Sequence, residues 1–173
     1  HLLFCADLIL DINWPQQSCR IIDSSFLSQC RVLAIDTVSD MVYYQNTHPS
    51  VHQQKTFSYQ YQKDEIKTMP DDLNNDGTVS LKPANWNGSS AWIQGLSNGT
   101  VKIRSQDLTT VLHHFKPVAN AGLYDLEVNP AAGTLTLLMR DYTMRVLDLA
   151  SLRPLATLFS GKQDRDYYLS AID

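Results

Sequence analysis

Length, composition and charge already limit what this protein can be. Its 173 residues, of which 43% are hydrophobic, suffice for one domain with a real apolar core. The formal net charge is −4 and no basic cluster stands out, so the chain lacks the electrostatic footprint of a nucleic-acid binder. We predict one domain, residues 1–173, and no nucleic-acid partner.

The segment from Leu2 to Ile12 is apolar apart from Asp7 and Asp11. Its eleven residues are too few to cross a bilayer, and it has neither the basic start nor the small-residue cleavage site of a signal peptide. We interpret it as a first strand or short helix that packs on the core. The alternative is the end of a membrane segment that precedes residue 1.

Cys19 and Cys30 are close enough in the chain to close a local loop through a disulfide, which leaves Cys5 over. In an oxidising compartment such a bridge stabilises a fold by about 2 to 3 kcal/mol, whereas cytosolic cysteines are small buried hydrophobes. Two sequons, Asn87-Gly88-Ser89 and Asn98-Gly99-Thr100, agree with secretion, although Asn-Gly also suits turns. We predict the Cys19–Cys30 bridge and an extracytoplasmic or secreted protein, with a cytoplasmic location as the alternative.

Two apolar runs, Arg31 to Asp36 and Met41 to Tyr44, flank a polar connection and predict an antiparallel hairpin. Thr56 to Tyr61 alternates polar and aromatic residues, so its aromatic side chains share one face of a strand. The eight tyrosines of the chain favour a role in protein recognition, because tyrosine is enriched at interfaces.

A possible calcium loop follows. Asp72, Asn74 and Asp76, with Gly77 after them, match the start of such a loop, in which alternate oxygens converge on one ion and glycine allows the sharp turn. The bidentate glutamate that should close the loop is replaced by Pro83. We therefore expect these three residues to bind Ca²⁺ weakly at best, and the alternative is an ordinary hairpin turn.

The second half of the chain contains a repeat. Asn98 to Ser105 is echoed by Asp141 to Asp148 at an offset of 43 residues, and Leu108 to Phe115 is echoed by Leu152 to Phe159 at an offset of 44. A period in this range indicates a repeat of several short strands.

Apolar alternation and turn residues divide the second copy into four short strands, at 124–128, 135–139, 144–146 and 155–159. We predict a mainly antiparallel all-β protein with blade-like four-stranded meanders, forming a partial or small propeller. A β-sandwich or β-barrel is the alternative. Within the one domain we distinguish an N-terminal segment with the cysteine loop (1–30), a hairpin and loop region (31–90), two repeat units (91–159) and a tail (160–173).

These repeat units resemble the blades of WD-repeat β-propellers. Leu126 to Pro130, Asp141 to Asp148 and Ser97 to Ile103 fit the family pattern of an apolar strand, a turn, and Asp-Gly-Thr-Val-Arg before a further apolar residue. Leu147 and Arg104 stand where the family has tryptophan. The resemblance implies propeller blades over residues 91–159.

No nucleophile elbow, phosphate loop or dinucleotide fingerprint occurs in the sequence. We therefore predict a protein without catalytic activity, and no cofactor apart from the Ca²⁺ considered above.

The function that we predict is a noncatalytic protein-recognition or scaffold module that acts through the edges and loops of its β-meanders, on a protein partner or a second copy. An incomplete set of blades leaves strand edges that a partner should cover. We place the contact on the unit from Thr134 to Phe159, with Tyr142, Met144, Arg145 and Val146 as candidate contact residues. The alternative is an extracytoplasmic sensor or regulatory domain of a membrane-anchored signalling protein.

Overall fold

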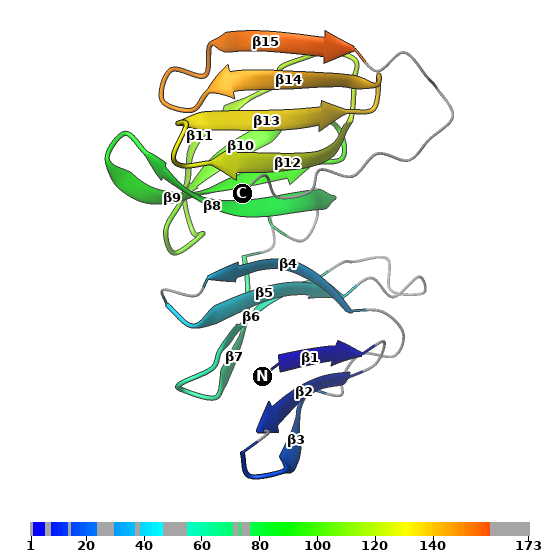
Figure 1. Cartoon of the computed structure of the whole chain (residues 1–173), viewed down its shortest axis with the longest axis vertical. Helices are drawn as coiled ribbons and strands as arrows, with labels where there is room; N and C mark the ends of the chain where they lie inside the picture. Colours follow the sequence, from blue (N-terminus) through cyan, green and yellow to red (C-terminus); the bar gives the residue numbers. More distant parts are fainter. Residues whose placement is uncertain are drawn as a thin grey trace. The chain divides into compact units, whose positions relative to one another are not determined.

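The structure is a computed structural model, and it describes residues 2–5, 8–13, 15–23, 30–36, 39–46, 55–70, 73 and 77–159. The chain divides into two compact units, His1–Asn75 and Asp76–Asp173. The strands in these described ranges pair antiparallel and form four sheets (Figure 1). No helix within the same ranges is long and apolar enough to cross a membrane.

The first unit holds a three-stranded and a four-stranded sheet. The smaller sheet has the order β1 (Leu2–Cys5), β2 (Leu8–Asn13) and β3 (Ser18–Asp23). The larger one has the order β4 (Cys30–Asp36), β5 (Met41–Asn46), β6 (Thr56–Gln60) and β7 (Glu65–Thr68). The apolar N-terminal segment thus contributes two paired strands, and of the two elements expected there the strand is the one observed.

The second unit holds two four-stranded sheets. The first consists of β8 (Thr78–Trp86), β9 (Ser89–Leu96), β10 (Val101–Ser105) and β11 (Val111–Phe115). The second consists of β12 (Leu123–Asn129), β13 (Thr134–Met139), β14 (Thr143–Asp148) and β15 (Pro154–Phe159). All four strands predicted for the second repeat copy lie within β12 to β15.

Each four-stranded sheet is a meander, because every strand pairs with the strands next to it in the chain. The predicted all-β fold with blade-like four-stranded meanders is confirmed. The alternative of a barrel is wrong, since none of the sheets formed by the described strands closes on itself.

The core of the second unit is a cluster of apolar side chains from both of its sheets and from the loops beside them. Its members are Ala91, Ile93, Val101, Ile103, Ala121, Leu123, Leu126, Val128, Leu135, Leu137, Met139, Leu147 and Leu149. Along β13 the cluster takes every second residue, as the alternation of a strand requires. Each leucine or isoleucine removed from water in this way contributes about 1.5 to 3 kcal/mol.

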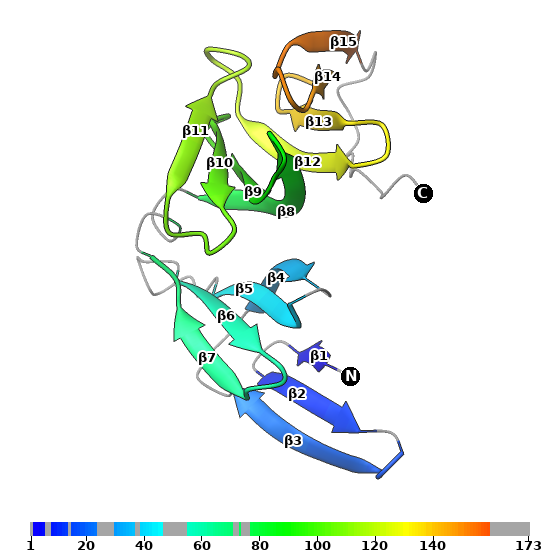
Figure 2. The ribbon, with the colours of Figure 1, turned by 90° about the vertical axis from the view of Figure 1, so that its left-hand side faces the viewer.

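The two sheets meet along their first strands, β8 and β12, which lie side by side in Figures 1 and 2. A glycine on β9 permits this approach. A Cβ atom at Gly95 would overlap Cδ2 of Leu123 and lie 2.7 Å from Cδ2 of Leu126. The absence of a side chain at Gly95 therefore leaves the space that these two core leucines occupy.

The turn between β9 and β10 contacts the segment that leads into β12. Gly99 has a φ of 89°, and a Cβ atom there would overlap the backbone carbonyl oxygen of Ala121. Both the left-handed backbone and the lack of space require glycine at this position.

The repeat seen in the sequence is present in the hydrogen bonds of the turns. The side-chain oxygen of Asn98 accepts from the backbone N–H of Thr100 at 2.9 Å. In the second copy, the carboxylate of Asp141 accepts from the backbone N–H of Thr143 at 3.1 Å. Asparagine and aspartate are interchangeable here because either side chain can cap a turn in this way.

A second recurring turn reveals a further copy of the repeat. Asp64, Leu108 and Leu152 follow one another at intervals of 44 residues, and each has a left-handed backbone, with φ of 52°, 64° and 57°. Each lies in the turn before the last strand of its sheet. The sheet β4–β7 of the first unit therefore has the same turn as the two repeat units. The recurring sequence pattern had indicated only the two units within residues 91–159.

Local hydrogen-bond donors lower the pKa of two carboxyl groups near these turns. At Asp148, the hydroxyl of Ser151 donates at 2.6 Å and its backbone N–H at 2.7 Å, and these bonds lower the pKa of the carboxyl below its ordinary value. The pKa of Asp107 is lowered in the same way, first by the hydroxyl of Ser105 and then by the N–H of Thr109.

Replacing Gly99 by alanine should destabilise the protein by about 2 to 5 kcal/mol, because left-handed strain adds to a clash with backbone. Gly133→Ala is the matched control. Its φ is 62° and nothing lies within 4 Å of the added Cβ, so strain alone should cost about 1 to 2 kcal/mol. Urea denaturation measures both, and equal losses would contradict the close approach to Ala121.

Replacing Ser151 by alanine should raise the pKa of Asp148 towards its ordinary value, because the hydroxyl donor is lost. Asp107 keeps its donors and is the control. Since the folded-state pKa is lowered, the stabilisation by ionised Asp148 is present above the unfolded-state pKa and is lost as the pH falls through the folded-state value. NMR titration of the carboxyl carbons tests this, and an unchanged pKa for Asp148 would argue against the assigned cause.

Candidate protein-interaction surfaces

The last strand of each four-stranded sheet is an edge. Among the described strands, β7, β11 and β15 each pair with one neighbour, so one side of each backbone has no ladder partner there. Free N–H and C=O groups in a row can pair with another chain, and proteins commonly protect such edges with charges.

The three edges differ in how they are protected. β7 carries an ion pair between Lys67 and Glu65 at 3.1 Å. β15 has no charged residue between Pro154 and Phe159, and its Leu155 and Leu158 are 59% and 56% exposed. β15 is therefore the edge with the most exposed large apolar side chains, since β7 has only Ile66 at 38% and β11 only Leu112 at 47%.

Part of the apolar surface beside β11 is covered by an aromatic row. His113 stacks on Trp86 and on Phe115, with ring centroids 5.9 Å and 6.2 Å apart. Both aromatic neighbours pack against the core cluster. The remaining exposed leucine of this edge is Leu112, which is 47% exposed.

The contact residues predicted from the sequence lie on β14 or in the turn before it. β14 pairs with both β13 and β15, so it is an inner strand and its ladder groups are used. Met144 and Val146 lie on one face of the sheet. Arg145 pairs with the core residue Leu137 and therefore lies on the other face. Tyr142 occupies the turn, with a φ of 63°.

Met144 and Val146 belong to two rows that cross the whole sheet. Strand pairing defines the rows as Asp125, Leu138, Met144 and Leu158, and Glu127, Thr136, Val146 and Ala156. We call this surface the Met144 face. Apart from Leu138, which is 6% exposed, its residues are partly or largely exposed. The sequence pointed to two of its members but not to the surface.

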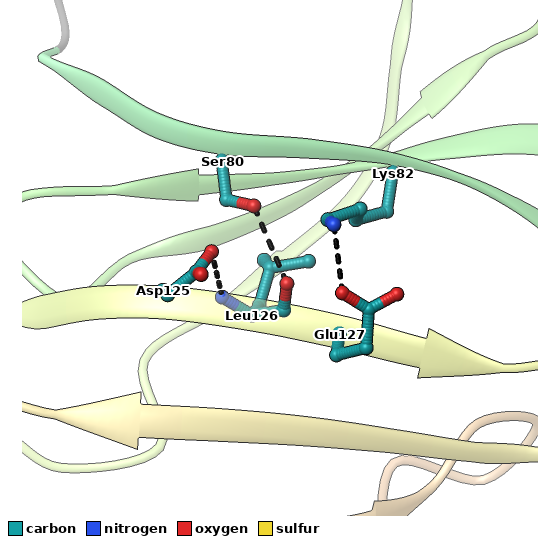
Figure 3. A network of polar contacts seen from close by, with 5 residues as sticks. All are labelled: Ser80, Lys82, Asp125, Leu126 and Glu127. Carbon is teal, nitrogen blue, oxygen red and sulfur yellow. Dashed lines mark hydrogen bonds and ion pairs between the residues drawn. The ribbon is translucent and has the colours of Figure 1, made fainter. Parts of the chain in front are cut away.

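Polar contacts join the first strands of the two sheets (Figure 3). The hydroxyl of Ser80 donates to the carbonyl oxygen of Leu126 at 3.3 Å. Nζ of Lys82 lies 2.7 Å from Oε2 of Glu127, and the two side chains are 31% and 22% exposed. A pair with this exposure contributes at most about 1 kcal/mol.

A buried polar network runs through the β8–β11 sheet. Nε of Arg104 donates to Oε1 of Gln94 at 2.6 Å, and Nε2 of Gln94 donates to the hydroxyl of Thr78 at 2.7 Å. Nη1 of Arg104 also donates to the carbonyl oxygen of Leu108 at 3.1 Å. The sequence marked Arg104 only as a departure from the tryptophan of the WD-repeat pattern, and the structure gives this departure a role.

In the β12–β15 sheet the same three places are occupied by leucine. Strand register and the repeat offset match Thr78, Gln94 and Arg104, in that order, with Leu123, Leu137 and Leu147. All three leucines belong to the core cluster. The same four-stranded sheet can therefore hold either hydrogen-bonded polar side chains or leucines at these three positions.

The tyrosines only partly support the interface role that was expected of them. Tyr43, Tyr44 and Tyr59 are buried at 5%, 0% and 1% exposure, so they are core residues. Burial, and secondarily the charge of Asp36, raises the pKa of Tyr43 to about 12. Two of the described tyrosines are exposed: Tyr61, which ends the predicted aromatic stretch, at 41%, and Tyr124, which lies on β12, at 45%.

The predicted calcium residues Asp72, Asn74 and Asp76 lie outside the described residues. Within the ranges that are described, no group of three or more His, Cys, Asp and Glu side chains could hold a metal ion. The Ca²⁺ hypothesis therefore stays a prediction.

The predicted disulfide is absent from the structure. Cys19 is exposed and free. It lies on β3, whereas Cys30 begins β4, so the two cysteines belong to different sheets although they are close in the chain. The two sequons do not distinguish a secreted from a cytoplasmic protein. Asn87 and Asn98 are both exposed in turns, and the turn conformation is sufficient reason for an Asn-Gly pair at each place.

Comparison with known proteins supports the fold. No family model matches the chain, and no curated protein matches it in sequence. The chain is similar to the crystal structure of Raptor from Chaetomium thermophilum, with a TM-score of 0.62 and 14% identity over 90% of this chain and 15% of that one. It is also similar to the computationally designed Ika8 protein, with a TM-score of 0.54 and 11% identity over 91% of this chain and 48% of that one.

The chain thus spans 15% and 48% of the lengths of these two proteins. At such low identity the similarity concerns the fold alone. The four-stranded antiparallel sheets are consistent with blade-like propeller units.

Replacing Arg104 by leucine should destabilise the protein by about 2 to 5 kcal/mol, because buried oxygens of Gln94 and Leu108 lose their donor. Replacing Thr78, Gln94 and Arg104 together by leucine should recover the part of this loss that comes from Gln94, since it reproduces the apolar set of the next sheet, while the carbonyl of Leu108 still lacks its donor. Urea denaturation of both variants measures the difference. A triple variant less stable than Arg104→Leu would show that the two sheets are not equivalent here.

Proposed function

We propose that this protein is a noncatalytic protein-recognition module that binds through the exposed edge strand β15, and that its four-stranded sheets are propeller blades of the WD-repeat type. The observation that carries the proposal is the composition of this edge. β15 has no charged residue, and its Leu155 and Leu158 are more than half exposed.

An extended segment of a partner can add to β15 as a further antiparallel strand. Backbone hydrogen bonds along the edge would supply affinity, and the exposed leucines would add apolar contacts with side chains of the partner. β7 suits this role less, because its Lys67–Glu65 ion pair would have to be disturbed. The partner is a protein segment, either from another protein or from a second copy of the chain.

Binding of this kind needs neither a nucleophile nor a metal ion. We therefore also propose that the module acts without catalysis and without a cofactor. The WD-repeat assignment has support from the recurring turns, in which Asn98 and Asp141 cap the third strand of successive sheets.

Leu155→Lys should weaken binding at least about tenfold, because a charge replaces an apolar contact on the edge. Leu112→Lys on β11 is the matched control and should change affinity less than about twofold, with both variants keeping their stability because both leucines are exposed. Peptides selected from a displayed library against the intact protein are the probe, together with analytical ultracentrifugation for self-association.

A protein that remains monomeric, selects no peptide and converts a small substrate would overturn the proposed function. Equal loss of binding in Leu155→Lys and Leu112→Lys would show that β15 is not the edge involved.

A further inference from the structure

The sequence contains two Asn-Gly pairs, and the structure places them in different surroundings. Asn87-Gly88 forms the turn between β8 and β9, and Asn98-Gly99 lies in the turn between β9 and β10. An asparagine before glycine can lose its side-chain amide, because the glycine has no side chain to hinder attack by its own backbone nitrogen. That nitrogen has to reach Cγ of the asparagine, so the freedom of each turn controls the rate.

The turn at Asn87 lies at the exposed tip of a hairpin. β10 pairs with β9 only as far as Ala91, so β8 and β9 continue beyond their neighbour to this turn (Figure 1). Asn87 and Gly88 are both exposed, and nothing lies within 4 Å of a Cβ atom added at Gly88. No hydrogen bond with another described residue holds the side chain of Asn87 or the N–H of Gly88. This turn can therefore open at little cost.

The turn at Asn98 is held at both reacting groups. Oδ1 of Asn98 accepts from the backbone N–H of Thr100 at 2.9 Å. The N–H of Gly99, which would be the attacking group, donates to the carbonyl oxygen of Leu96 at 2.9 Å. Gly99 is also buried against the backbone carbonyl of Ala121. The reaction at Asn98 thus requires the release of two hydrogen bonds and of a packed backbone contact.

We infer that Asn87 is a site of spontaneous deamidation in the folded protein and that Asn98 is protected from it. The backbone nitrogen of Gly88 forms a bond to Cγ of Asn87, the proton of the Gly88 N–H passes to the side-chain nitrogen, and that nitrogen leaves as ammonia. Water then opens the five-membered succinimide at either carbonyl carbon, which gives aspartate or isoaspartate at position 87. The only other reactant is water.

This modification goes beyond the proposed function, because it changes the β8–β9 turn and not the β15 edge. Both products carry a carboxylate, which adds one negative charge to a chain whose formal net charge is −4. Isoaspartate also adds one carbon to the main chain of a turn that joins the paired residues Trp86 and Ser89. Trp86 stacks on His113 at 5.9 Å, so the altered residue directly follows a member of the aromatic row.

The test is to incubate the intact protein at neutral pH and to follow both asparagines by peptide mass spectrometry. We expect Asn87 to react at least about tenfold faster than Asn98, because the reaction at Asn98 must first break two hydrogen bonds. Asn87→Gln is the control for the assignment. The longer side chain cannot close a five-membered ring, so no acid form should appear at position 87 in the same period.

Incubation in denaturing guanidinium chloride is the matched comparison. There the two rates should differ less than about twofold, because the unfolded chain exposes both Asn-Gly pairs alike. Leu155→Lys in the folded protein should leave both rates unchanged, which separates this inference from the proposed function.

Equal rates at Asn87 and Asn98 in the folded protein would overturn the inference. A ratio of rates that is the same in guanidinium chloride would also overturn it, because the difference would then come from the neighbouring sequence and not from the fold.

Discussion

The second unit depends on the burial of one face of each of its sheets against the other. A single antiparallel sheet of four short strands leaves both faces in water and has little to offset its loss of conformational entropy. The facing rows around Ile93 and Leu137 remove this problem for both sheets at once. Gly95 permits the close approach by leaving space for the leucines of β12. Each sheet has to bury apolar side chains in the same way, so buried apolar residues recur at matching strand positions in both repeats.

The interior tolerates more than one chemistry at equivalent positions. Arg104 and its hydrogen-bonded partners in one sheet are matched by three leucines in the next. Both solutions are stable for the same reason, namely that no buried group loses a partner it had in water. A mixture of the two would leave buried oxygens without donors. Positions that look like departures from a repeat pattern can therefore be substituted only as a set.

The surfaces available for association follow from the order of strands. Every meander ends in an edge strand, and among these β15 has the most exposed large apolar side chains. Every repeat also has two faces, and the last described sheet has one face without a counterpart in its own unit. An edge of this kind suits an extended segment, because the free N–H and C=O groups of β15 can continue the ladder.

The sequence by itself determined the four strands of the second repeat copy, their turns and the recurrence within residues 91–159, because alternation and turn chemistry act between neighbours in the chain. It also marked Arg104 as an unusual position. Only the tertiary structure decided that Tyr44 is core, that β14 lies inside its sheet, and that Cys19 and Cys30 belong to different sheets. The physical reason is that apolar and polar residues alternate along a strand in the same way whichever of its two faces is buried. Burial and edges depend on which strands meet in space.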